Sequence, residues 1–372
     1  MTTVAVTKCN SYSEAEVNNA LCKVCDISGF PDVKGKKVLL KPNILSDAQP
    51  SDSITTNPMV VRQAIRYCRD KGASEIYVGD SPGMQNSGFK PVKSGIYAVC
   101  VEEGARWVDF TQKPVVKTLE TVGTKVPVAS IVDEADVIIG LCKMKNHQLM
   151  YVTGAVKNFF GVIPTINKSQ CHLKFQSREA FARMLVNLHE TVKPDFSIMD
   201  AVISMEGPGP ANGTPRKTCL LLASENDYAL DQAQAIIMGY DPTQLPLLSE
   251  ASNQHLIPQE VEYPDLDPRD LIIKDFVRIP YRKKTQFFSK LILPFFGRWI
   301  EGKKQQKEQK PVFDKEKCIH CLKCVNICPG SALTFNKENK CIVPDYKKCI
   351  RCYCCHEMCP VAAIEIKGRN ND

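Results

Sequence analysis

The sequence has 372 residues, 44% of them hydrophobic, so the chain is too long for one small module and can bury a substantial core. This composition excludes an intrinsically disordered chain, and no run of about 20 apolar residues predicts a membrane-spanning helix. The formal net charge of +7 is local, because residues 281–310 alone contain nine Lys or Arg and two Glu, and we therefore expect no nucleic-acid partner.

The cysteines are distributed unevenly along the chain. Eight of the 18 are scattered between Cys9 and Cys219, as buried small side chains usually are, and ten fall between Cys318 and Cys359. The opening residues MTTVAVTKCN lack a basic segment followed by an apolar one, so we expect no signal peptide. Free thiols without export fit a reducing cytoplasm, where a dense cysteine block indicates metal ligands rather than disulfides.

Strand-like and helix-like segments alternate along the front part of the chain, before the basic stretch. A helix is predicted over 55–72, where Thr56 or Asn57 caps the start, Pro58 lies in the first turn and Gly72 ends it. Two further helices are predicted over 177–190 and 227–238, and short apolar runs predict strands at 36–43, 75–83, 136–145, 195–200 and 218–226. The alternation predicts an α/β domain over residues 1–280, with a mostly parallel sheet covered by helices on both faces.

Polar side chains fall at or just past the carboxyl ends of four predicted strands. Ligands of open α/β sheets bind in the crevice outside these strand ends, so we expect a site for an anionic ligand there. Taken singly, the residues have ordinary explanations, such as a turn or cap for an Asp and a surface position for a Lys. The residues are Lys41, Asn43, Asp80, Ser81, Lys143, Lys145, His147, Asp200 and Glu206.

The segment TGAVKNFFG, 153–161, combines flexible glycines with Lys157 and Asn158. Such a segment can bring backbone N–H groups and an ammonium group to a carboxylate or phosphate. The alternative is a tight corner with Phe159 and Phe160 in the core. His147 and Lys157 are the candidate catalytic residues. His147 and His172 are also candidates for acid–base groups or metal ligands, since histidine titrates near neutral pH.

Several nucleotide and hydrolase motifs are absent. No G-x-x-x-x-G-K-[ST] loop occurs, and EGPGPANG, 206–213, lacks the glycine spacing of a dinucleotide-binding turn. Neither a nucleophile elbow nor a metalloprotease helix is present.

Residues 281–311 form a basic connector around the apolar stretch QFFSKLILPFFGRWI. One interpretation is a linker whose aromatic side chains pack against the flanking domains. The other is an interfacial anchor, with aromatic residues among lipid headgroups and Lys or Arg on anionic lipid, which would give peripheral membrane contact through 281–310.

The cysteine block in residues 312–372 repeats one motif. Cys318, Cys321, Cys324 and Cys328-Pro329 follow the spacing C-x2-C-x2-C-x3-C-P, and Cys349, Cys352, Cys355 and Cys359-Pro360 repeat it with every gap preserved. This is the run of bacterial two-cluster ferredoxins, in which the fourth cysteine serves the other cluster. The repeat therefore predicts two 4Fe-4S clusters: Cys318, Cys321, Cys324 and Cys359 for cluster 1, and Cys328, Cys349, Cys352 and Cys355 for cluster 2.

Zinc also binds four thiolates and is the alternative, although zinc sites rarely use two such runs. Cys341 and Cys354 lie outside the repeated spacing, and His320 and His356 are expected in loops rather than as ligands. Because oxygen degrades exposed clusters, we expect a cytoplasm with little or no oxygen.

Four motifs along the front domain resemble one known family: KPNIL (41–45), GDSPG (79–83), KMKNHQLMYVTGAVKNFFGVIP (143–164) and MEGPGP (205–210). In their order they resemble the family catalogued as domain of unknown function 362, over about residues 1–275. Members often carry a two-cluster ferredoxin module at the C-terminus, so the resemblance implies this architecture rather than a particular reaction.

Three functions fit these observations. The first is a redox enzyme whose clusters exchange single electrons with a small anionic substrate in the front domain. The second is an electron carrier whose front domain docks a redox partner protein, and the third is a metal- or cluster-handling protein. Fusion in one chain favours the first two, because a tether keeps one module at about millimolar effective concentration near the other.

Overall fold

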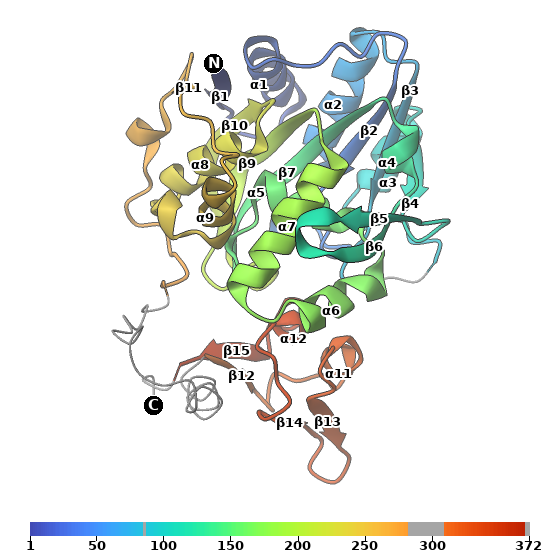
Figure 1. Cartoon of the computed structure of the whole chain (residues 1–372), viewed down its shortest axis with the longest axis vertical. Coiled ribbons are helices and arrows are strands. Elements are labelled where there is room, and N and C mark those ends of the chain that lie inside the picture. Colours follow the sequence, from blue (N-terminus) through green and yellow to red (C-terminus); the bar gives the residue numbers. More distant parts are fainter. Residues whose placement is uncertain (85–86, 282–308, 369–372) are drawn as a thin grey trace. The chain divides into compact units, whose positions relative to one another are not determined.

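The computed structural model describes residues 1–84, 87–281 and 309–368, and the chain divides into two compact units (Figure 1). Unit 1 comprises Met1–Ile279, and unit 2 comprises Pro280–Asp372. Most of the predicted basic connector, residues 282–308, lies outside the described residues.

Unit 1 contains a nine-stranded sheet in the order β11-β1-β10-β9-β7-β2-β3-β4, with β8 paired to β7, and a separate hairpin, β5–β6. From β9 to β4 all neighbours are parallel, whereas β10 runs antiparallel to both β9 and β1. The predicted α/β fold with a mostly parallel sheet is confirmed. The strands are β1 (Thr2–Lys8), β2 (Lys37–Pro42), β3 (Glu75–Asp80), β4 (Arg106–Asp109), β5 (Val115–Leu119), β6 (Thr124–Val128), β7 (Val137–His147), β8 (Tyr151–Val152), β9 (Phe196–Glu206), β10 (Thr214–Ser224) and β11 (Val261–Glu262).

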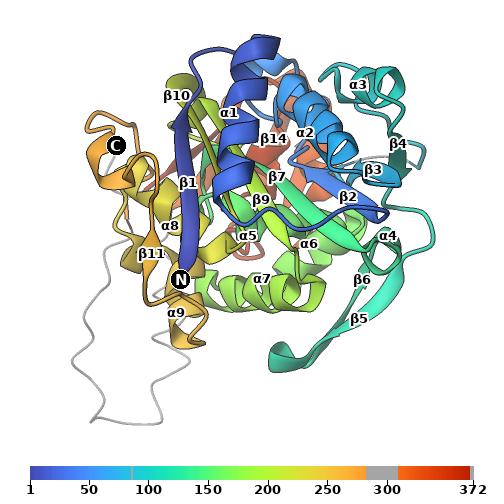
Figure 2. The ribbon, with the colours of Figure 1, turned by 90° about the horizontal axis from the view of Figure 1, so that it is seen from above.

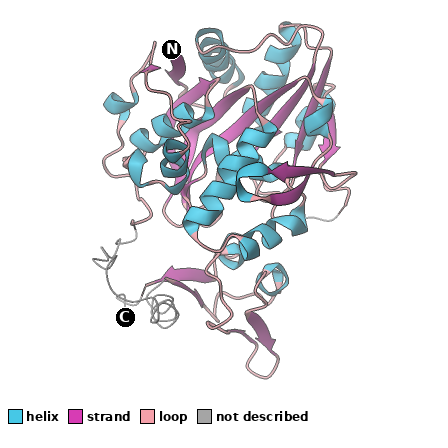
Figure 3. Cartoon of the chain, viewed as in Figure 1, coloured by secondary structure: helices cyan, strands magenta, loops and turns pink. Residues whose placement is uncertain are grey.

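Helices cover both faces of this sheet (Figures 2 and 3). Alternate strand residues explain why: Ala5 of β1 packs into a core with α1 and α2, while its neighbours Val4 and Val6 pack into another core with α8. The helices of unit 1 are α1 (Glu14–Ile27), α2 (Pro58–Asp70), α3 (Ile96–Glu102), α4 (Ile131–Glu134), α5 (Gly154–Asn158), α6 (Thr165–Lys174), α7 (Arg178–Val192), α8 (Asp227–Ile237) and α9 (Pro246–Asn253), with 3-10 turns η1 (Pro50–Asp52), η2 (Glu120–Val122), η3 (Phe159–Val162), η4 (Pro242–Gln244) and η5 (Pro268–Leu271). Within the described part of the chain, every helix is too short or too polar to cross a bilayer.

Local sequence signals account for where α2 begins. The Asn57 side chain accepts a hydrogen bond of 2.9 Å from the backbone N–H of Met59, and Pro58 occupies the first helical position. Other boundaries move: β7 extends to His147, just beyond the predicted strand, and β9 extends to Glu206, well beyond it. These extensions carry polar side chains into the sheet itself.

Unit 2 is built from two equivalent halves, each consisting of a strand, a cysteine-bearing loop, a short helix and a second strand. The first half contains β12 (Lys310–Phe313), α11 (Lys323–Ile327) and β13 (Leu333–Asn336), and the second contains β14 (Cys341–Pro344), α12 (Cys354–Glu357) and β15 (Ile364–Lys367). β12 pairs antiparallel with β15, and β13 pairs antiparallel with β14, so every strand pair within residues 309–368 joins one half to the other.

A buried polar cluster joins α7 to α8 in unit 1. His189 Nε2 lies 2.8 Å from Asp227 Oδ2, and His189 Nδ1 lies 3.2 Å from Glu190 Oε1, which also accepts a 2.6 Å hydrogen bond from Tyr228. Burial alone would lower the pKa of His189, but the hydrogen bonds to Asp227 and Glu190 raise it to about 9. His189 is therefore a buried cation at neutral pH.

The substitution His189→Gln should flatten the pH dependence of unfolding. With a pKa raised from 6.5 to about 9, His189 contributes stability that is complete below pH 6.5 and is lost as the pH rises through about 9. The full contribution is about 3 kcal/mol. Thermal unfolding followed by circular dichroism between pH 6 and 9.5 should show a steeper loss of stability in the wild type than in the variant. The exposed His255, changed to Asn, serves as the control, and parallel profiles for wild type and His189→Gln would contradict the assignment.

Candidate functional site

Charged side chains from parallel strands meet at the carboxyl edge of the sheet in unit 1. Lys41 lies at the end of β2 and Asp80 at the end of β3, and their side-chain Nζ and Oδ1 atoms are 2.7 Å apart. The pair is almost completely buried, with 0% and 3% of the side chains exposed. The backbone N–H of Ile44 donates to the other Asp80 oxygen at 2.6 Å, so the carboxylate also fixes the chain that leaves β2.

Gly161 makes room for this ion pair. A Cβ atom at this position would lie 2.0 Å from Asp80 Oδ1 and 2.5 Å from Lys41 Nζ, so no larger residue fits without displacing the pair. Burial lowers the pKa of Lys41, and the neighbouring Asp80 opposes that shift. The motifs KPNIL and GDSPG and the glycine of NFFG therefore belong to one packed arrangement.

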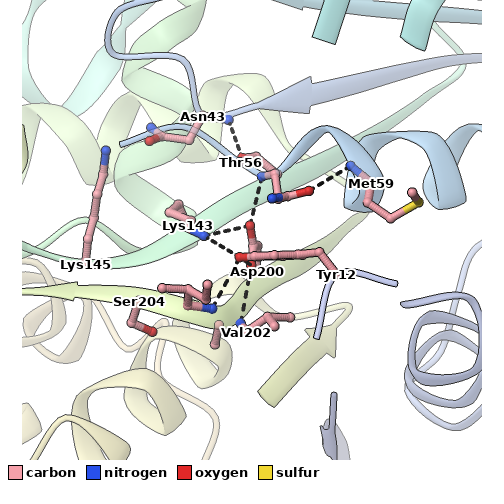
Figure 4. Close-up of polar contacts among 12 residues, drawn as sticks. Tyr12, Asn43, Thr56, Met59, Lys143, Lys145, Asp200, Val202 and Ser204 are labelled. Carbon is pink, nitrogen blue, oxygen red and sulfur yellow. Dashed lines mark hydrogen bonds and ion pairs between the residues drawn. The ribbon is translucent and has the colours of Figure 1, made fainter. Parts of the chain in front are cut away.

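A second buried ion pair joins β7 to β9 (Figure 4). Lys143 Nζ lies 2.8 Å from Asp200 Oδ2 and donates at 2.9 Å to the hydroxyl oxygen of Tyr12, which itself donates to Asp200 Oδ1 at 2.7 Å. Asp200 also accepts a 2.9 Å bond from the backbone N–H of Asn57, the cap of α2. Burial, and then Asp200, raise the pKa of Tyr12, which keeps it a neutral phenol.

The pocket next to these pairs is lined by several of the predicted residues. It encloses about 250 Å³, open solvent included. Among the described residues that line it, two are lysines and none is acidic, so the pocket suits an anion. The lining residues are Asn43, Leu45, Lys145, His147, Thr153, Lys157, Asn158 and Pro210.

Lys41, Asp80, Lys143 and Asp200 are close to one another in the sheet but do not line this pocket. Each lysine is neutralised by a carboxylate, so the four residues hold the strand ends in place. Their direct contact with a ligand stays a prediction, as does the ligand-binding role of the pocket residues. Asn158 connects the two groups, because its Nδ2 donates to the Lys41 carbonyl at 3.0 Å while its Oδ1 accepts from Lys41 Nζ at 3.3 Å.

His147 is held in one protonation state. Its Nδ1 accepts hydrogen bonds from the backbone N–H groups of Leu149 and Met150 at 3.1 and 3.2 Å. Burial, followed by the positive charges of Lys157 and Lys145, lowers the pKa of His147 well below its ordinary value of 6.5. The neutral ring therefore carries its proton on Nε2 and suits a hydrogen-bond donor at neutral pH.

The other predicted features of this region lie in the core. Phe159 and Phe160 are buried, as the alternative interpretation of this segment expects. His172 stacks on Phe181 with 4.2 Å between ring centroids, and burial lowers its pKa to about 3. His172 therefore acts as a neutral aromatic side chain outside the pocket.

Three structural residues were not found from the sequence. Tyr12 bridges Lys143 and Asp200, and Lys168 donates to the carbonyl groups of Ser81 and, at 3.2 Å, Pro82. Asp231 accepts hydrogen bonds from the first backbone N–H groups of α5. Tyr12 and Lys168 gave no local signal, whereas Asp231 is an acidic residue on the apolar side of a predicted helix, a pattern that could have been noticed.

In unit 2 the first predicted set of cluster ligands surrounds one hollow. Cys318, Cys321, Cys324 and Cys359 all line a space of about 480 Å³, open solvent included. Burial, and after it the nearby thiols of the other three, raise the pKa of Cys324 to about 11. Closely placed thiolates repel one another, and iron relieves this repulsion, so the donor set fits a cluster.

The second predicted set is brought together in the same way. Burial, and then Cys352, Cys349 and Cys328, raise the pKa of the Cys355 thiol well above its ordinary value. The Ala332 N–H donates to Cys328 Sγ at 3.3 Å, and the equivalent Ala363 N–H donates to Cys359 Sγ at 3.2 Å. Such N–H···S bonds favour the thiolate form that binds iron.

Backbone strain repeats with the motif. His320 and Leu322 have φ values of 56° and 60°, and Arg351 and Tyr353, at the equivalent places of the second motif, have 59° and 64°. Residues other than glycine adopt this conformation rarely, so both loops bend in the same unusual way. His320 contacts the Phe335 ring, and His356 Nδ1 bonds the Ile364 carbonyl at 2.6 Å.

Cys355→Ser should lose cluster 2 and keep cluster 1. Iron content and visible absorbance of the anaerobically purified protein should fall by about half, because one of four thiolate ligands is replaced by a poorer one. Cys354→Ser is the matched control: it changes the adjacent cysteine, which lies outside the repeated spacing, and should keep all the iron. Full iron in Cys355→Ser together with a loss in Cys354→Ser would overturn the ligand assignment.

Comparisons with known proteins find one similar protein sequence and two solved structures of similar fold. A thylakoid-associated protein of Synechocystis sp. is 30% identical over 253 residues, covering 65% of this chain and 76% of that protein. A crystal structure of a Thermotoga maritima protein aligns with a TM-score of 0.38 and 14% identity, over 56% of this chain and 55% of that one. The lactate racemase apoprotein of Thermoanaerobacterium thermosaccharolyticum aligns with a TM-score of 0.42 and 14% identity, over 63% and 57%. The chain thus spans less than two thirds of either solved protein.

Two family models match the chain, one in each unit. The model of a 4Fe-4S dicluster domain matches residues 310–360, which include all eight cysteines of the repeat. The other matches residues 38–235, from β2 into α8, and so contains every residue that lines the pocket described above. The chain therefore belongs to the family described as domain of unknown function (DUF362), and it carries a 4Fe-4S dicluster domain behind that family's α/β domain.

Proposed function

We propose that this protein is an iron–sulfur oxidoreductase that transfers single electrons between two 4Fe-4S clusters in unit 2 and a small anionic ligand bound in unit 1. The observation that carries the proposal is the pocket at the sheet edge, whose described lining combines Lys145 and Lys157 with neutral hydrogen-bond donors and no carboxylate. The dicluster domain in the same chain supplies the electron carrier.

The residues of the pocket have distinct roles in this proposal. Lys157 and Lys145 attract the anionic group of the ligand, and the amides of Asn43 and Asn158 orient it. The neutral His147 donates its Nε2 proton in a hydrogen bond to the ligand oxygen on which negative charge grows during reduction. The clusters, when bound, supply electrons one at a time.

Lys145 also has a structural anchor, since its ammonium donates to the Ile54 carbonyl at 2.6 Å and its side chain is buried. Lys157 is only half-buried, so it is the cation better placed to respond to a ligand. We therefore assign the first contact with the anion to Lys157.

Lys157→Ala should abolish ligand-dependent oxidation of the reduced clusters while leaving the iron content unchanged. The measurement follows visible absorbance of the anaerobically reduced, full-length protein during addition of carboxylates, phosphates and fractionated cell metabolites. Lys174→Ala, at an exposed position in α6, should behave as the wild type. Equal oxidation rates in wild type and Lys157→Ala would remove Lys157 from the site. No response from any of the three proteins would favour the alternative functions, a carrier that docks a protein partner or a metal- or cluster-handling protein.

We also propose that the protein contacts membranes peripherally from the cytoplasmic side. Residues 281–310 have a net charge of +7, and a 30% identical relative is named for its association with thylakoids. Basic segments of this kind bind anionic lipid surfaces through charge.

The full-length protein should sediment with vesicles that contain phosphatidylglycerol and remain in solution with phosphatidylcholine alone. Raising the salt concentration should release it, because charge attraction is screened. Replacing Arg282, Lys283 and Lys284 with Gln should weaken the binding about a hundredfold, at about 1 kcal/mol for each charge. Equal binding to both kinds of vesicle would contradict this proposal.

A further inference from the structure

The short helix α5 brings two of the pocket residues into place. It spans only Gly154–Asn158, and both Lys157 and Asn158 line the pocket. A helix of this length is not stable by itself, because forming its first turn costs the backbone freedom of several residues and gains only one hydrogen bond. Contacts outside α5 must therefore set its orientation.

The last turn of α5 is held by the sheet. Asn158 exchanges hydrogen bonds with Lys41, and Asn43 Nδ2 donates to Asn158 Oδ1 at 3.5 Å. These contacts position the carboxyl end of the helix, but they do not reach its first residues.

The first turn of α5 is held by a carboxylate from α8. Asp231 Oδ1 accepts a 2.5 Å bond from the backbone N–H of Ala155, and its Oδ2 accepts a 3.2 Å bond from that of Val156. The Asp231 side chain is only 2% exposed. It thus replaces water as the partner of N–H groups that no helix can satisfy internally.

Gly154 is the residue that permits this approach. Its φ of 68° lies in the left-handed region, and a Cβ atom there would meet Asp231 Oδ1 at 2.3 Å. The position therefore requires glycine for two reasons, its backbone conformation and the space that the carboxylate occupies.

We infer that Asp231 is a positioning residue for the pocket. Its side chain holds α5 so that Lys157 and Asn158 reach an anionic ligand. This inference rests on the function proposed for the pocket. Asp231 itself does not line the pocket and acts only through α5.

The surroundings of Asp231 make its contribution depend on pH. Burial and then Asp227 raise the pKa of Asp231 to about 8, against the two backbone hydrogen bonds and His189, which lower it. The other titratable groups that face it are Tyr228 on α8 and Cys142 on β7. Below about pH 8 the carboxyl is protonated and has one good acceptor oxygen; above it, both oxygens accept.

Ligand binding should therefore tighten as Asp231 ionises, while the fold loses stability over the same pH range. The raised pKa means that the folded protein keeps a proton that the unfolded chain loses above pH 3.8, so this contribution to stability declines as the pH rises through about 8. The two effects have opposite signs, which distinguishes positioning of the pocket from a general effect on stability.

Sulfate is the probe for the experiment, because it stays doubly charged across the pH range used. Its affinity for the full-length protein is measured by calorimetry between pH 6 and 8.5, a range in which His189 stays mostly protonated. In the wild type the affinity for sulfate should increase about fivefold from pH 6 to pH 8.5, which corresponds to the gain of about one hydrogen bond. Asp231→Asn should bind sulfate weakly at every pH, without this increase, and Gly154→Ala should bind weakly as well. Asp270→Asn, at an exposed position, is the matched control and should keep the wild-type profile.

Amide hydrogen exchange by mass spectrometry tests the same inference without a ligand. Residues 154–162 should exchange about fivefold faster in Asp231→Asn than in the wild type, while α2 remains unchanged. Unchanged exchange in that segment, or a wild-type pH profile for sulfate in the variant, would overturn the inference. If the wild type binds no sulfate at any pH but the segment exchanges faster in Asp231→Asn, the proposed pocket fails and the positioning of α5 by Asp231 is supported.

Discussion

The ion pair between Lys143 and Asp200 is the contact on which the sheet edge of unit 1 depends. It joins two neighbouring parallel strands, and Asp200 also accepts hydrogen bonds from Tyr12 and from the cap of α2. An unpaired charge at such a depth costs about 3–5 kcal/mol, so each group requires its partner in register. The second pair joins Lys41 of β2 to Asp80 of β3, the next two strands of the sheet after β7, and it likewise requires the two strands to be in register. Together they fix the strand ends against which α5, and with it the pocket, is placed.

The fold of unit 1 was predictable where apolar residues form continuous runs. Such runs mark β2, β3, β7, β9 and β10, and the Asn57–Pro58 signal marks the start of α2. The last two residues of β7, Asn146 and His147, were not predicted, since polar residues after an apolar run look like the start of a loop. The strands β1 and β4 and the hairpin β5–β6 were also missed. They gave no signal strong enough to separate them from loops.

The site was only partly predictable, for a related reason. Strand ends of a parallel sheet share one edge, so the grouping of Asn43, Lys145, His147, Lys157 and Asn158 could be expected from their places in the sequence. The neutralisation of Lys41 and Lys143 could not be predicted, because Asp80 and Asp200 can be recognised as their partners only when the strand order is known. Asp231 contributes from α8, which is distant from α5 in the sequence. In unit 2 the repeated spacing of the cysteines was enough to predict both ligand sets, including the one cysteine that each set takes from the other half.

The strand pairing of unit 2 has a consequence for the history of the chain. Within residues 309–368 both sheets are formed between the halves, and neither half contains a strand pair of its own. A single half would thus present two unpaired strand edges to solvent, with an incomplete hydrophobic surface beneath them. Before the duplication, a peptide of this length could have closed its sheets only by associating with an identical copy about a two-fold axis. With both halves in one chain, the closing of the two sheets is part of folding and does not depend on protein concentration.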